Sequence, residues 1–362
     1  MQKRRLGRTG LEVSQVGFGG TWIAQLSPDE ATKVIKSAFE GGITYFDTAK
    51  WDGDSEQKLG VALKGVRDEC AIATKTGSRT KRESLDDLKE SLRLLQTDRL
   101  DIIQLHGIDD EATLQKAMGE DGALQTCKQA RREGLVDYVG ITSHKPRVLM
   151  KAIDTGEFDT VLVPLNVVTR QALEELIPHA KAHDVGVVAM KPFSAKTSKL
   201  ITCLYSPSLS LLSDEPELKA LLGEDNASMA RNALRFTLAQ DISVVIPGVK
   251  SIREAQVAAD AGNQYTGLTL EEQRRFQVQF DQETYCRDCG MCLPCPEGID
   301  IATVLRFQNL ADAYGLKEWA KKLYGGLEVK ADRCRSCRIC APKCPYQLPV
   351  VRLLEEADKK LR

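Results

Sequence analysis

The sequence predicts a (β/α)8 barrel that is followed by a small, all-helical domain. Short runs rich in Val, Ile and Leu alternate eight times with amphipathic stretches over about 260 residues, and this order builds a closed parallel barrel. Eight of the eleven cysteines lie in the last eighty residues, in two groups separated by a helical pattern. A doubly wound sheet is the alternative for the first part, but no G-x-G-x-x-G follows a predicted strand.

The predicted strands are near-continuous apolar runs, which is the composition of parallel strands that are buried on both faces. A separate hairpin, Arg4–Val13 with its turn at Thr9-Gly10, precedes them. The eight strands are predicted at Val16–Gly19, Ile43–Thr48, Cys70–Thr74, Leu100–His106, Tyr138–Ser143, Thr160–Leu165, Gly186–Lys191 and Ser243–Pro247.

The first predicted helix begins at Ser27-Pro28-Asp29-Glu30, where Ser is the N-cap, Pro takes the first helical position and Glu completes a capping box. Gly41-Gly42 ends this helix. A long insertion, residues 194–226, follows the seventh strand, and long loops on the catalytic face of a barrel commonly carry function. The other predicted helices are Glu56–Leu63, Ser84–Leu95, Leu124–Glu133, Arg147–Ile153, Gln171–His183, Ala227–Ala239 and Ile252–Ala261.

Composition excludes several classes of partner. The 362 residues are 42% hydrophobic and 28% charged with a formal net charge of −1, so no strong field favours nucleic acid or a membrane surface. No apolar run approaches the roughly 20 residues of a membrane span. The basic residues 1–5 have no apolar stretch behind them, unlike a signal peptide. We expect a cytoplasmic protein, because many cysteines without a signal fit a reducing compartment.

The two cysteine groups have the spacing of iron–sulfur ligands. The second group has the spacing of a bacterial ferredoxin, and the first departs from it by one residue. In two-cluster ferredoxins the fourth Cys of a group ligates the other group's cluster. Structural zinc is the alternative, but zinc sites usually present two separated Cys pairs. On the ferredoxin pattern, one [4Fe-4S] cluster takes Cys286, Cys289, Cys292 and Cys344, and the other takes Cys334, Cys337, Cys340 and Cys295.

The chain divides into three predicted parts. Residues 1–267 form the barrel, residues 268–284 a polar linker helix, and residues 285–362 the dicluster domain. Between the cysteine groups, residues 296–333 are helical in pattern, which differs from the shorter, β-containing spacer of a small ferredoxin. The apolar positions expected to pack around the clusters are Leu305, Phe307, Leu310, Tyr314, Trp319 and Leu323.

Polar residues follow most of the predicted strands. Barrel chemistry belongs at the carboxyl ends of strands, so these side chains are candidate site residues. They are Asp47, Lys75, His106, Thr142, Ser143, His144, Asn166 and Lys191.

The pattern of these residues resembles the aldo-keto reductases over residues 1 to about 265. With the cysteine-rich tail, the chain is similar to the iron–sulfur-containing branch of that superfamily. The resemblance implies an NADP(H)-linked oxidoreductase that acts on a small carbonyl or hydroxyl compound. It rests on Arg5-Leu6-Gly7-Arg8-Thr9-Gly10-Leu11-Glu12-Val13-Ser14, Phe46-Asp47-Thr48-Ala49, Ser55-Glu56, Lys75, Leu105-His106 and Ile246-Pro247-Gly248.

The resemblance also implies an Asp–Tyr–Lys–His tetrad. NADPH gives hydride to a carbonyl carbon and Tyr gives a proton to its oxygen, while Lys and Asp lower the pKa of the Tyr and His orients the substrate. Asp47, Lys75 and His106 match this pattern, but the gapless segment that follows Asp47 has Asp52 where the family has Tyr.

Four interpretations of Asp52 remain open. Asp52 could act as a protonated acid, although a neighbouring Lys75 should lower its pKa. His106 could be the acid, with Asp52 and Lys75 only polarising the substrate. Tyr45, which shares a strand face with Asp47 deeper in the barrel, or Tyr205 could supply the phenol. Reductase chemistry could also be lost or altered. We favour the second and the fourth interpretations.

The segment that begins at Ile246 resembles the family's adenosine-phosphate segment. Lys250 and Arg253 are then candidate partners of the NADP 2′-phosphate, and a solvated helix start is the alternative. Ser143 and Asn166 are candidates to hold the nicotinamide amide. The expected cofactor-binding set is Ser143, Asn166, Lys191, Gly248, Lys250 and Arg253.

Other histidines and cysteines receive plainer interpretations. His179 and His183 are four residues apart on one predicted helix, which is a zinc-like spacing, yet they stand beside Lys181 on an outer barrel helix. We therefore expect both to face solvent. The cysteines outside the two groups, expected to be packing residues, are Cys70, Cys127 and Cys203.

The main functional hypothesis is an iron–sulfur oxidoreductase whose clusters exchange electrons with an external carrier, such as a ferredoxin or another redox protein. One alternative is an electron-transfer or partner-docking subunit with a degenerate barrel, which the loss of the phenol at Asp52 suggests. Another is a lyase or isomerase in which Lys75, Asp52 and His106 act as acid and base without net redox.

Overall fold

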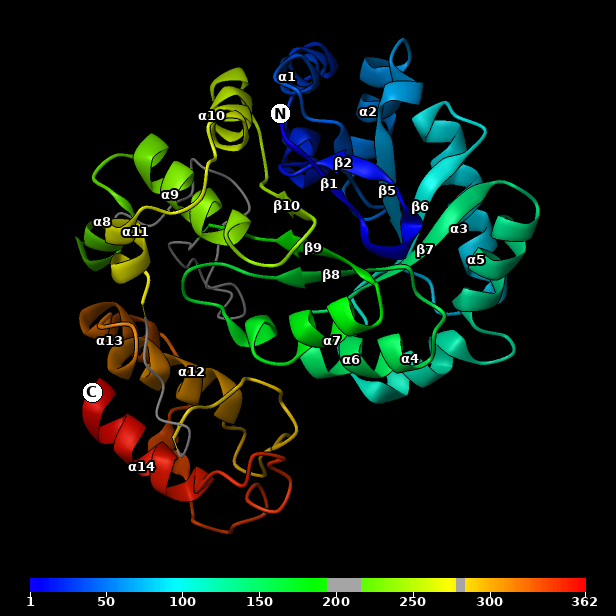
Figure 1. Cartoon of the computed structure of the whole chain (residues 1–362). Helices are drawn as coiled ribbons and strands as arrows, with labels where there is room; N and C mark the ends of the chain where they lie inside the picture. The colour runs from blue at the N-terminus through cyan, green and yellow to red at the C-terminus, as the bar shows by residue number, and fades with distance from the viewer. Residues whose placement is uncertain (194–215, 278–283) are drawn as a thin grey trace.

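The computed structural model describes residues 1–193, 216–277 and 284–362. An eight-stranded parallel sheet runs in chain order from β3 to β10, and parallel bridges from Val16 to Val245 and from Gly19 to Gly248 join its two edge strands. The predicted barrel is therefore confirmed (Figure 1). The strands are β3 (Phe18–Gly19), β4 (Tyr45–Asp47), β5 (Ala71–Thr76), β6 (Leu100–Leu105), β7 (Val136–Thr142), β8 (Thr160–Pro164), β9 (Gly186–Met190) and β10 (Val244–Ile246).

The predicted N-terminal hairpin is formed by β1 (Lys3–Arg5) and β2 (Glu12–Ser14), with Arg4 opposite Val13. A short 3₁₀ turn connects the two strands. Buried side chains of the hairpin join the inward-facing side chains of the barrel strands in one apolar cluster. The hairpin thus closes the end of the barrel opposite the carboxyl ends of the strands. The buried members of this cluster are Leu6, Val13, Tyr45, Ala71, Ala73, Ile102, Leu162, Val188, Val244 and Ile246.

Helices surround the barrel, and most begin and end close to their predicted bounds. The Ser27 hydroxyl accepts a hydrogen bond from the Glu30 N–H, and the Glu30 carboxylate accepts one from the Ser27 N–H, as the capping box predicts. The helix Glu111–Met118 had no counterpart among the predicted elements. The barrel helices are α1 (Pro28–Glu40), α2 (Ser55–Leu63), α3 (Lys81–Leu95), α4 (Glu111–Met118), α5 (Ala123–Arg132), α6 (Pro146–Asp154), α7 (Leu176–Ala182), α9 (Asn226–Leu238) and α10 (Ile252–Asn263).

The prediction of one helix over Gln171–His183 is wrong. The segment forms a 3₁₀ turn at Gln171–Leu173 and then α7 from Leu176. Pro178 explains the break, because its missing N–H and its ring are tolerated only in the first turn of a helix. The helix therefore starts just before this proline.

Two predicted segments lie partly outside the described residues. Of the insertion 194–226, the structure describes α8 (Pro216–Leu222) and the start of α9. Of the linker 268–284, it describes α11 (Leu270–Arg275), which Thr269 caps.

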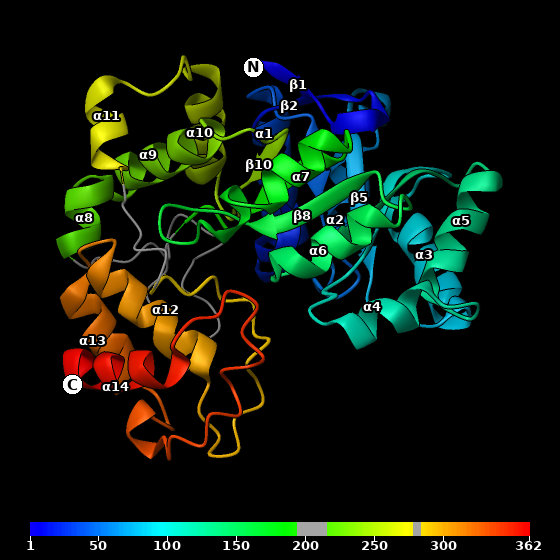
Figure 2. The ribbon, with the colours of Figure 1, turned by 60° about the horizontal axis from the view of Figure 1, so that its bottom comes forward.

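The C-terminal domain is helical, as predicted, and contains α12 (Ile301–Asp312), α13 (Lys317–Gly325) and α14 (Val350–Leu361). The first cysteine group precedes α12, and the second lies between α13 and α14. Figure 2 shows these helices side by side. Trp319 and Phe307 are fully buried between them. The Tyr324 hydroxyl donates to the Asp358 carboxylate at 2.5 Å and so ties α13 to α14.

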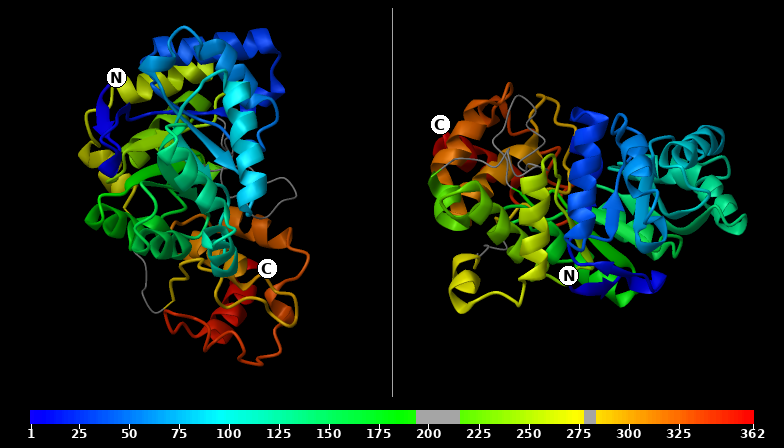
Figure 3. Two further views of the ribbon diagram at one scale, coloured as in Figure 1. Left: turned by 90° about the vertical axis from the view of Figure 1, so that its right-hand side faces the viewer. Right: turned by 90° about the horizontal axis from the view of Figure 1, so that it is seen from above.

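The C-terminal domain packs against one side of the barrel (Figure 3). The contacts come from the loops that lead into α6 and α7. Nζ of Lys145 lies 3.5 Å from Oδ1 of Asp288. Nε of Arg287 lies 2.9 Å from Oε2 of Glu174. The Tyr346 hydroxyl donates to the Glu175 carboxylate at 3.2 Å. These loops follow β7 and β8, so the domain adjoins the carboxyl ends of the strands. None of the described helices is long and apolar enough to cross a membrane.

Candidate active site and cluster sites

A buried ion pair stands at the mouth of the barrel. Asp47 ends β4, and its Oδ1 lies 2.5 Å from the Nζ of Lys75 on β5. Gln104 on β6 donates from Nε2 to the other Asp47 oxygen at 2.9 Å. Burial raises the pKa of Asp47, while Lys75 acts in the opposite direction. Gln104 was not identified as a site residue from the sequence. It stands two residues before His106 and so lies on the same face of the strand, which could have indicated it.

Asp52 lies beside this pair in the loop between β4 and α2. The Thr21 hydroxyl donates to its carboxylate at 3.2 Å. Burial raises the pKa of Asp52, and the Lys75 ammonium offsets only part of this effect. Lys75 does act to lower the Asp52 pKa, as expected, but the loss of hydration outweighs this attraction, so the expected net lowering is wrong.

His106 is neutral at ordinary pH. Burial, together with the positive charges of Lys75 and Arg79, lowers its pKa to about 3. Its ring packs on the indole of Trp51 with centroids 4.8 Å apart. The Trp51 ring needs a glycine at position 77, because a Cβ on Gly77 would lie 2.0 Å from it. A neutral imidazole can donate a hydrogen bond, but it is a poor acid, which disfavours His106 as the proton donor.

A second polar chain runs along the same mouth. The Asp109 carboxylate lies 2.9 Å from Nδ1 of His144, whose Nε2 lies 2.8 Å from the Lys191 ammonium. The Ser143 hydroxyl also donates to Asp109, at 3.0 Å. Burial alone would raise the pKa of Asp109, but hydrogen bonds from His144 and Ser143 outweigh it and hold the pKa well below its usual range. Asp109 was not identified as a site residue from the sequence, although it stands only three residues after the candidate His106.

These groups surround a cavity of about 140 Å³. Tyr45 does not reach it, because its ring is fully buried in the barrel interior and burial raises the pKa of its hydroxyl well above the usual value. Tyr205 lies outside the described residues. The polar residues that line the cavity are Thr21, Asp47, Asp52, Lys75, His106, Thr142, His144 and Lys191, and the others are Leu162, Met190, Ile246, Gly19 and Gly248.

A larger cavity, of about 440 Å³, lies between the barrel and the C-terminal domain. His144 and Lys191 line both cavities, so the two adjoin. On its other side the larger cavity is lined by Arg287, Asp288 and Arg306 of the C-terminal domain. A volume of this size falls within the 300–1,000 Å³ range that is usual for small-molecule sites.

The cysteines surround two small cavities in the C-terminal domain. The structure brings together Cys286, Cys289, Cys292 and Cys344 around one of them, which is the grouping predicted for one cluster. The second cavity is lined by Cys295, Cys334, Cys337 and Cys340, which is the other predicted grouping, with Cys292 at its edge.

The cysteine chemistry fits metal ligation. Each cavity is lined by at least four thiol groups, and four is the number of cysteine ligands that a [4Fe-4S] cluster takes. Cys70 and Cys127, in contrast, are buried in the barrel core as packing residues, while Cys203 lies outside the described residues.

The candidate phosphate segment lies at the start of α10. A cavity of about 360 Å³ there is lined by Lys33, Lys250 and Arg253. Ser251 caps the twelve-residue helix, whose N-terminus favours an anion. Three cations at a helix N-terminus fit a phosphate group, although the carboxylate of Glu30 also lines this cavity.

The structure gives Asn166 and Ser143 local roles. The Asn166 amide donates to the Lys191 carbonyl at 3.0 Å and accepts from the Val168 N–H at 3.0 Å. Neither Asn166 nor Ser143 lines the two cavities at the barrel mouth. Asn166 thus holds the backbone of Lys191, another predicted cofactor residue, and Ser143 holds the loop that carries His144.

The barrel and the cysteine-rich domain correspond to two known protein families. A model of the aldo/keto reductase family matches residues 15–272, and a model of the 4Fe-4S dicluster domain matches residues 285–349. The chain belongs to the aldo/keto reductase family and carries a C-terminal 4Fe-4S dicluster domain. The predicted family, fold and enzyme class are confirmed.

Curated relatives support the same class. The L-galactose dehydrogenase of Arabidopsis thaliana is 30% identical over 309 residues, which are 77% of this chain and 93% of that protein. The uncharacterized oxidoreductase YqkF of Bacillus subtilis is 28% identical over 311 residues, covering 79% of this chain and 98% of that protein.

Solved structures have the same barrel. An aldo-keto reductase from Bacillus halodurans in its holo form is 30% identical with a TM-score of 0.62, over 76% of this chain and 95% of that chain. An aldo-keto reductase from Klebsiella pneumoniae in complex with NADPH is 20% identical with a TM-score of 0.62, over 76% of this chain and 94% of that chain. The second likeness concerns the fold alone.

Proposed function

We propose that this protein is an NADP(H)-linked oxidoreductase of a small carbonyl or hydroxyl compound, and that two [4Fe-4S] clusters exchange electrons with its barrel site. The observation that carries the proposal is that three cavities adjoin one another in a row from the barrel mouth to the first cluster site. The catalytic cavity shares His144 and Lys191 with the larger cavity, which shares Arg287 and Ala302 with the cavity of the first cluster. A ligand in the larger cavity would contact both redox regions.

We assign the proton-donor role to Asp52. Its burial favours the protonated carboxyl, which can donate to the oxygen of a carbonyl as hydride reaches the carbon. His106, held neutral, orients the same oxygen through a hydrogen bond. The Asp47–Lys75 pair fixes a positive charge beside the oxygen, where negative charge develops.

The two cofactors differ in how they carry electrons. Bound NADPH supplies two electrons as hydride, whereas each cubane passes one electron at a time. Direct coupling therefore needs a carrier, such as a flavin, or a substrate radical that accepts both kinds of transfer. The larger cavity has the volume for such a group, and a ferredoxin or another redox protein would be the external partner of the clusters.

The experiment is an anaerobic NADPH titration of protein whose clusters have been reconstituted. We expect NADPH to bind with micromolar affinity and, with added flavin to convert hydride into single electrons, to bleach the visible absorbance of the clusters. Lys191→Met is the matched variant, since it alters the wall between the cavities, and we expect it to slow bleaching while dithionite still reduces the clusters.

Two results would contradict the proposal. If NADPH does not bind while ferredoxin reduces the clusters, the protein is an electron-transfer or docking subunit with a degenerate barrel. If substrate turnover proceeds without any nicotinamide and without net redox, the barrel is a lyase or isomerase. Tight NADPH binding with carbonyl turnover would exclude both alternatives.

A further inference from the structure

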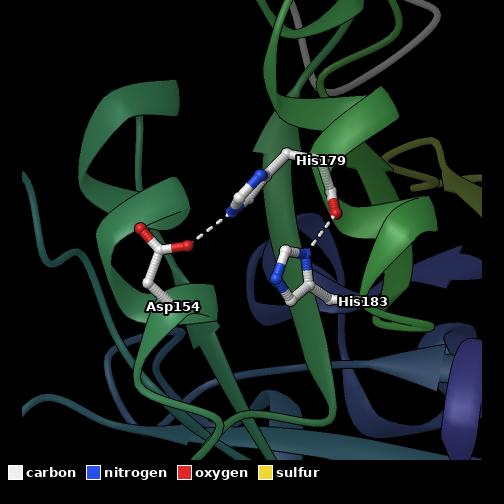
Figure 4. A group of neighbouring side chains, drawn as sticks. All are labelled: Asp154, His179 and His183. Carbon is white, nitrogen blue, oxygen red and sulfur yellow. Dashed lines mark hydrogen bonds and ion pairs between the residues drawn. The ribbon is translucent and has the colours of Figure 1, made fainter.

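Two helices of the barrel bring three potential metal ligands together at a point remote from the catalytic mouth. Asp154 ends α6, and His179 and His183 stand four residues apart at the end of α7. One ligand atom from each residue lies within 4.8 Å of the others. Figure 4 shows the two rings and the carboxylate turned toward the same space.

The hydrogen bonds prepare these side chains for a cation. Nδ1 of His183 lies 2.9 Å from the backbone carbonyl oxygen of His179. A carbonyl only accepts, so this Nδ1 carries the proton and Nε2 of His183 keeps a free lone pair. A hydrogen bond of this kind, from the non-ligating nitrogen to a carbonyl, orients most metal-bound histidines. Nε2 of His179 donates to the Asp154 carboxylate at 2.7 Å, so a cation at this point would take the place of that proton.

The backbone adds a second, independent attraction for a cation. The last carbonyl groups of a helix carry a partial negative charge, because they lack partners within the helix. Asp154 is the last residue of α6, and His183 directly follows the last residue of α7. Two helix C-termini therefore converge on the space between these ligands.

We propose that Asp154, His179 and His183 bind a zinc ion, with water as the remaining ligand. Two imidazole nitrogens and one carboxylate oxygen form a donor set that zinc prefers, and histidines spaced four apart on a helix are a recurrent zinc-binding pair. His183 is exposed and His179 half-buried, so small side-chain rotations can bring the ligand atoms to tetrahedral spacing.

The position of the site gives the metal a structural role. The two helices that it joins are those on which the C-terminal domain rests, at their opposite ends. Lys145 is the N-cap of α6 and binds Asp288, while Glu175 is the N-cap of α7 and contacts Tyr346. A metal clamp at the C-terminal ends of α6 and α7 would hold this two-helix support of the cluster domain in one arrangement.

A simpler explanation is an ion pair alone. A protonated His179 beside Asp154 at a helix C-terminus would be favourable without a metal. If this explanation holds, the protein does not bind zinc at this point, and Nε2 of His183 takes no part in the interaction. Titration with zinc separates the two possibilities.

The test uses the full-length protein with its clusters in place, under anaerobic conditions, titrated with zinc chloride by calorimetry. We expect one zinc ion per chain to bind with micromolar affinity, without loss of the visible cluster absorbance. His183→Ala and Asp154→Asn should each weaken binding by at least about tenfold. Lys181→Gln is the matched control, because Lys181 is on the same helix but pairs with Asp241, and it should keep the affinity.

X-ray absorption at the zinc edge identifies the ligands. A shell of nitrogen and oxygen near 2.0–2.1 Å with imidazole scattering supports the proposal, whereas a sulfur shell near 2.3 Å would show that zinc binds to cysteines instead. The proposal is also overturned if zinc does not bind in the micromolar range, or if His183→Ala leaves the affinity unchanged while the protein stays folded.

Discussion

The cysteine domain and the barrel mouth differ in what determines their sites. In the C-terminal domain, spacing along the chain already groups the ligands, and the two cysteine-lined cavities follow the crosswise grouping, with Cys344 beside the first group and Cys295 beside the second. At the barrel mouth, residues from many separate strands meet, and their chemistry depends on burial. The cysteine sites are therefore determined mainly by local spacing along the chain. The site at the barrel mouth exists only once the whole barrel has folded.

The crosswise arrangement of the cysteines predicts the largest single effect. Cys344→Ser should abolish the cluster of the first cysteine group, although residue 344 belongs to the second group in the sequence. We expect iron and sulfide to fall from about eight to about four per chain. Chemical analysis of iron and sulfide measures this, together with electron paramagnetic resonance of the reduced protein.

The matched control for this change is Cys127→Ala, since Cys127 is a buried packing residue of α5 far from the clusters. It should leave the iron count unchanged. Loss of the second cluster instead of the first in Cys344→Ser would mean that each group ligates its own cluster, contrary to the arrangement of the cavities.

The buried pair at the barrel mouth predicts the next largest effect. Lys75→Met leaves the Asp47 carboxylate buried without its cation, which typically costs about 3–5 kcal/mol of stability. Substrate turnover should fall by about a hundredfold or more. Thermal unfolding and steady-state kinetics provide the two measurements.

A double variant separates electrostatics from packing at this pair. Asp47→Asn together with Lys75→Met removes both charges, so we expect it to regain much of the stability that Lys75→Met alone loses. Activity should remain low in both variants. Equal destabilisation in the single and the double variant would show that the cost comes from packing and not from an unpaired charge.

Much of the fold could be predicted from the sequence, because apolar runs and caps are local signals. All eight barrel strands and the capping box at Ser27 were predicted, whereas the split at Pro178 and the short helix α4 were not. The pKa directions of Asp52 and His106 could not be predicted, since they arise from burial by residues distant in the chain. The family resemblance places Lys75 beside residue 52 and suggested that its charge would set the Asp52 pKa, whereas the loss of hydration has the larger effect.

The pH dependence of the free energy of unfolding tests the opposite pKa shifts of His106 and Asp52. The pKa of His106 is lowered from 6.5 to about 3 in the folded protein. As the pH falls, His106 is therefore protonated in the unfolded chain before it is protonated in the folded protein. The contribution of His106 to stability is full above pH 6.5 and is lost as the pH falls toward 3. His106→Gln should flatten this part of the stability profile, as measured by chemical denaturation across the range.

Asp52 should show the reverse sign. Its pKa is raised in the folded protein, so its contribution is present at low pH and is lost as the pH rises through the folded pKa. Asp52→Asn should therefore stabilise the protein at neutral pH relative to the parent while turnover falls about a hundredfold. If Asp52→Asn retains full carbonyl turnover with the same pH profile, Asp52 is not the proton donor.

The smallest effect concerns the phosphate segment at the start of α10. Arg253→Ala removes an exposed cation beside Lys250 and the helix N-terminus, and a charge-assisted hydrogen bond to phosphate is worth about 1.5–3 kcal/mol. We expect NADPH affinity to fall by at least about tenfold, with no change for NADH, which lacks the 2′-phosphate. Arg231→Ala, on the neighbouring helix α9, is the control. An equal loss of affinity for both nucleotides would show that Arg253 supports the loop instead of binding the phosphate.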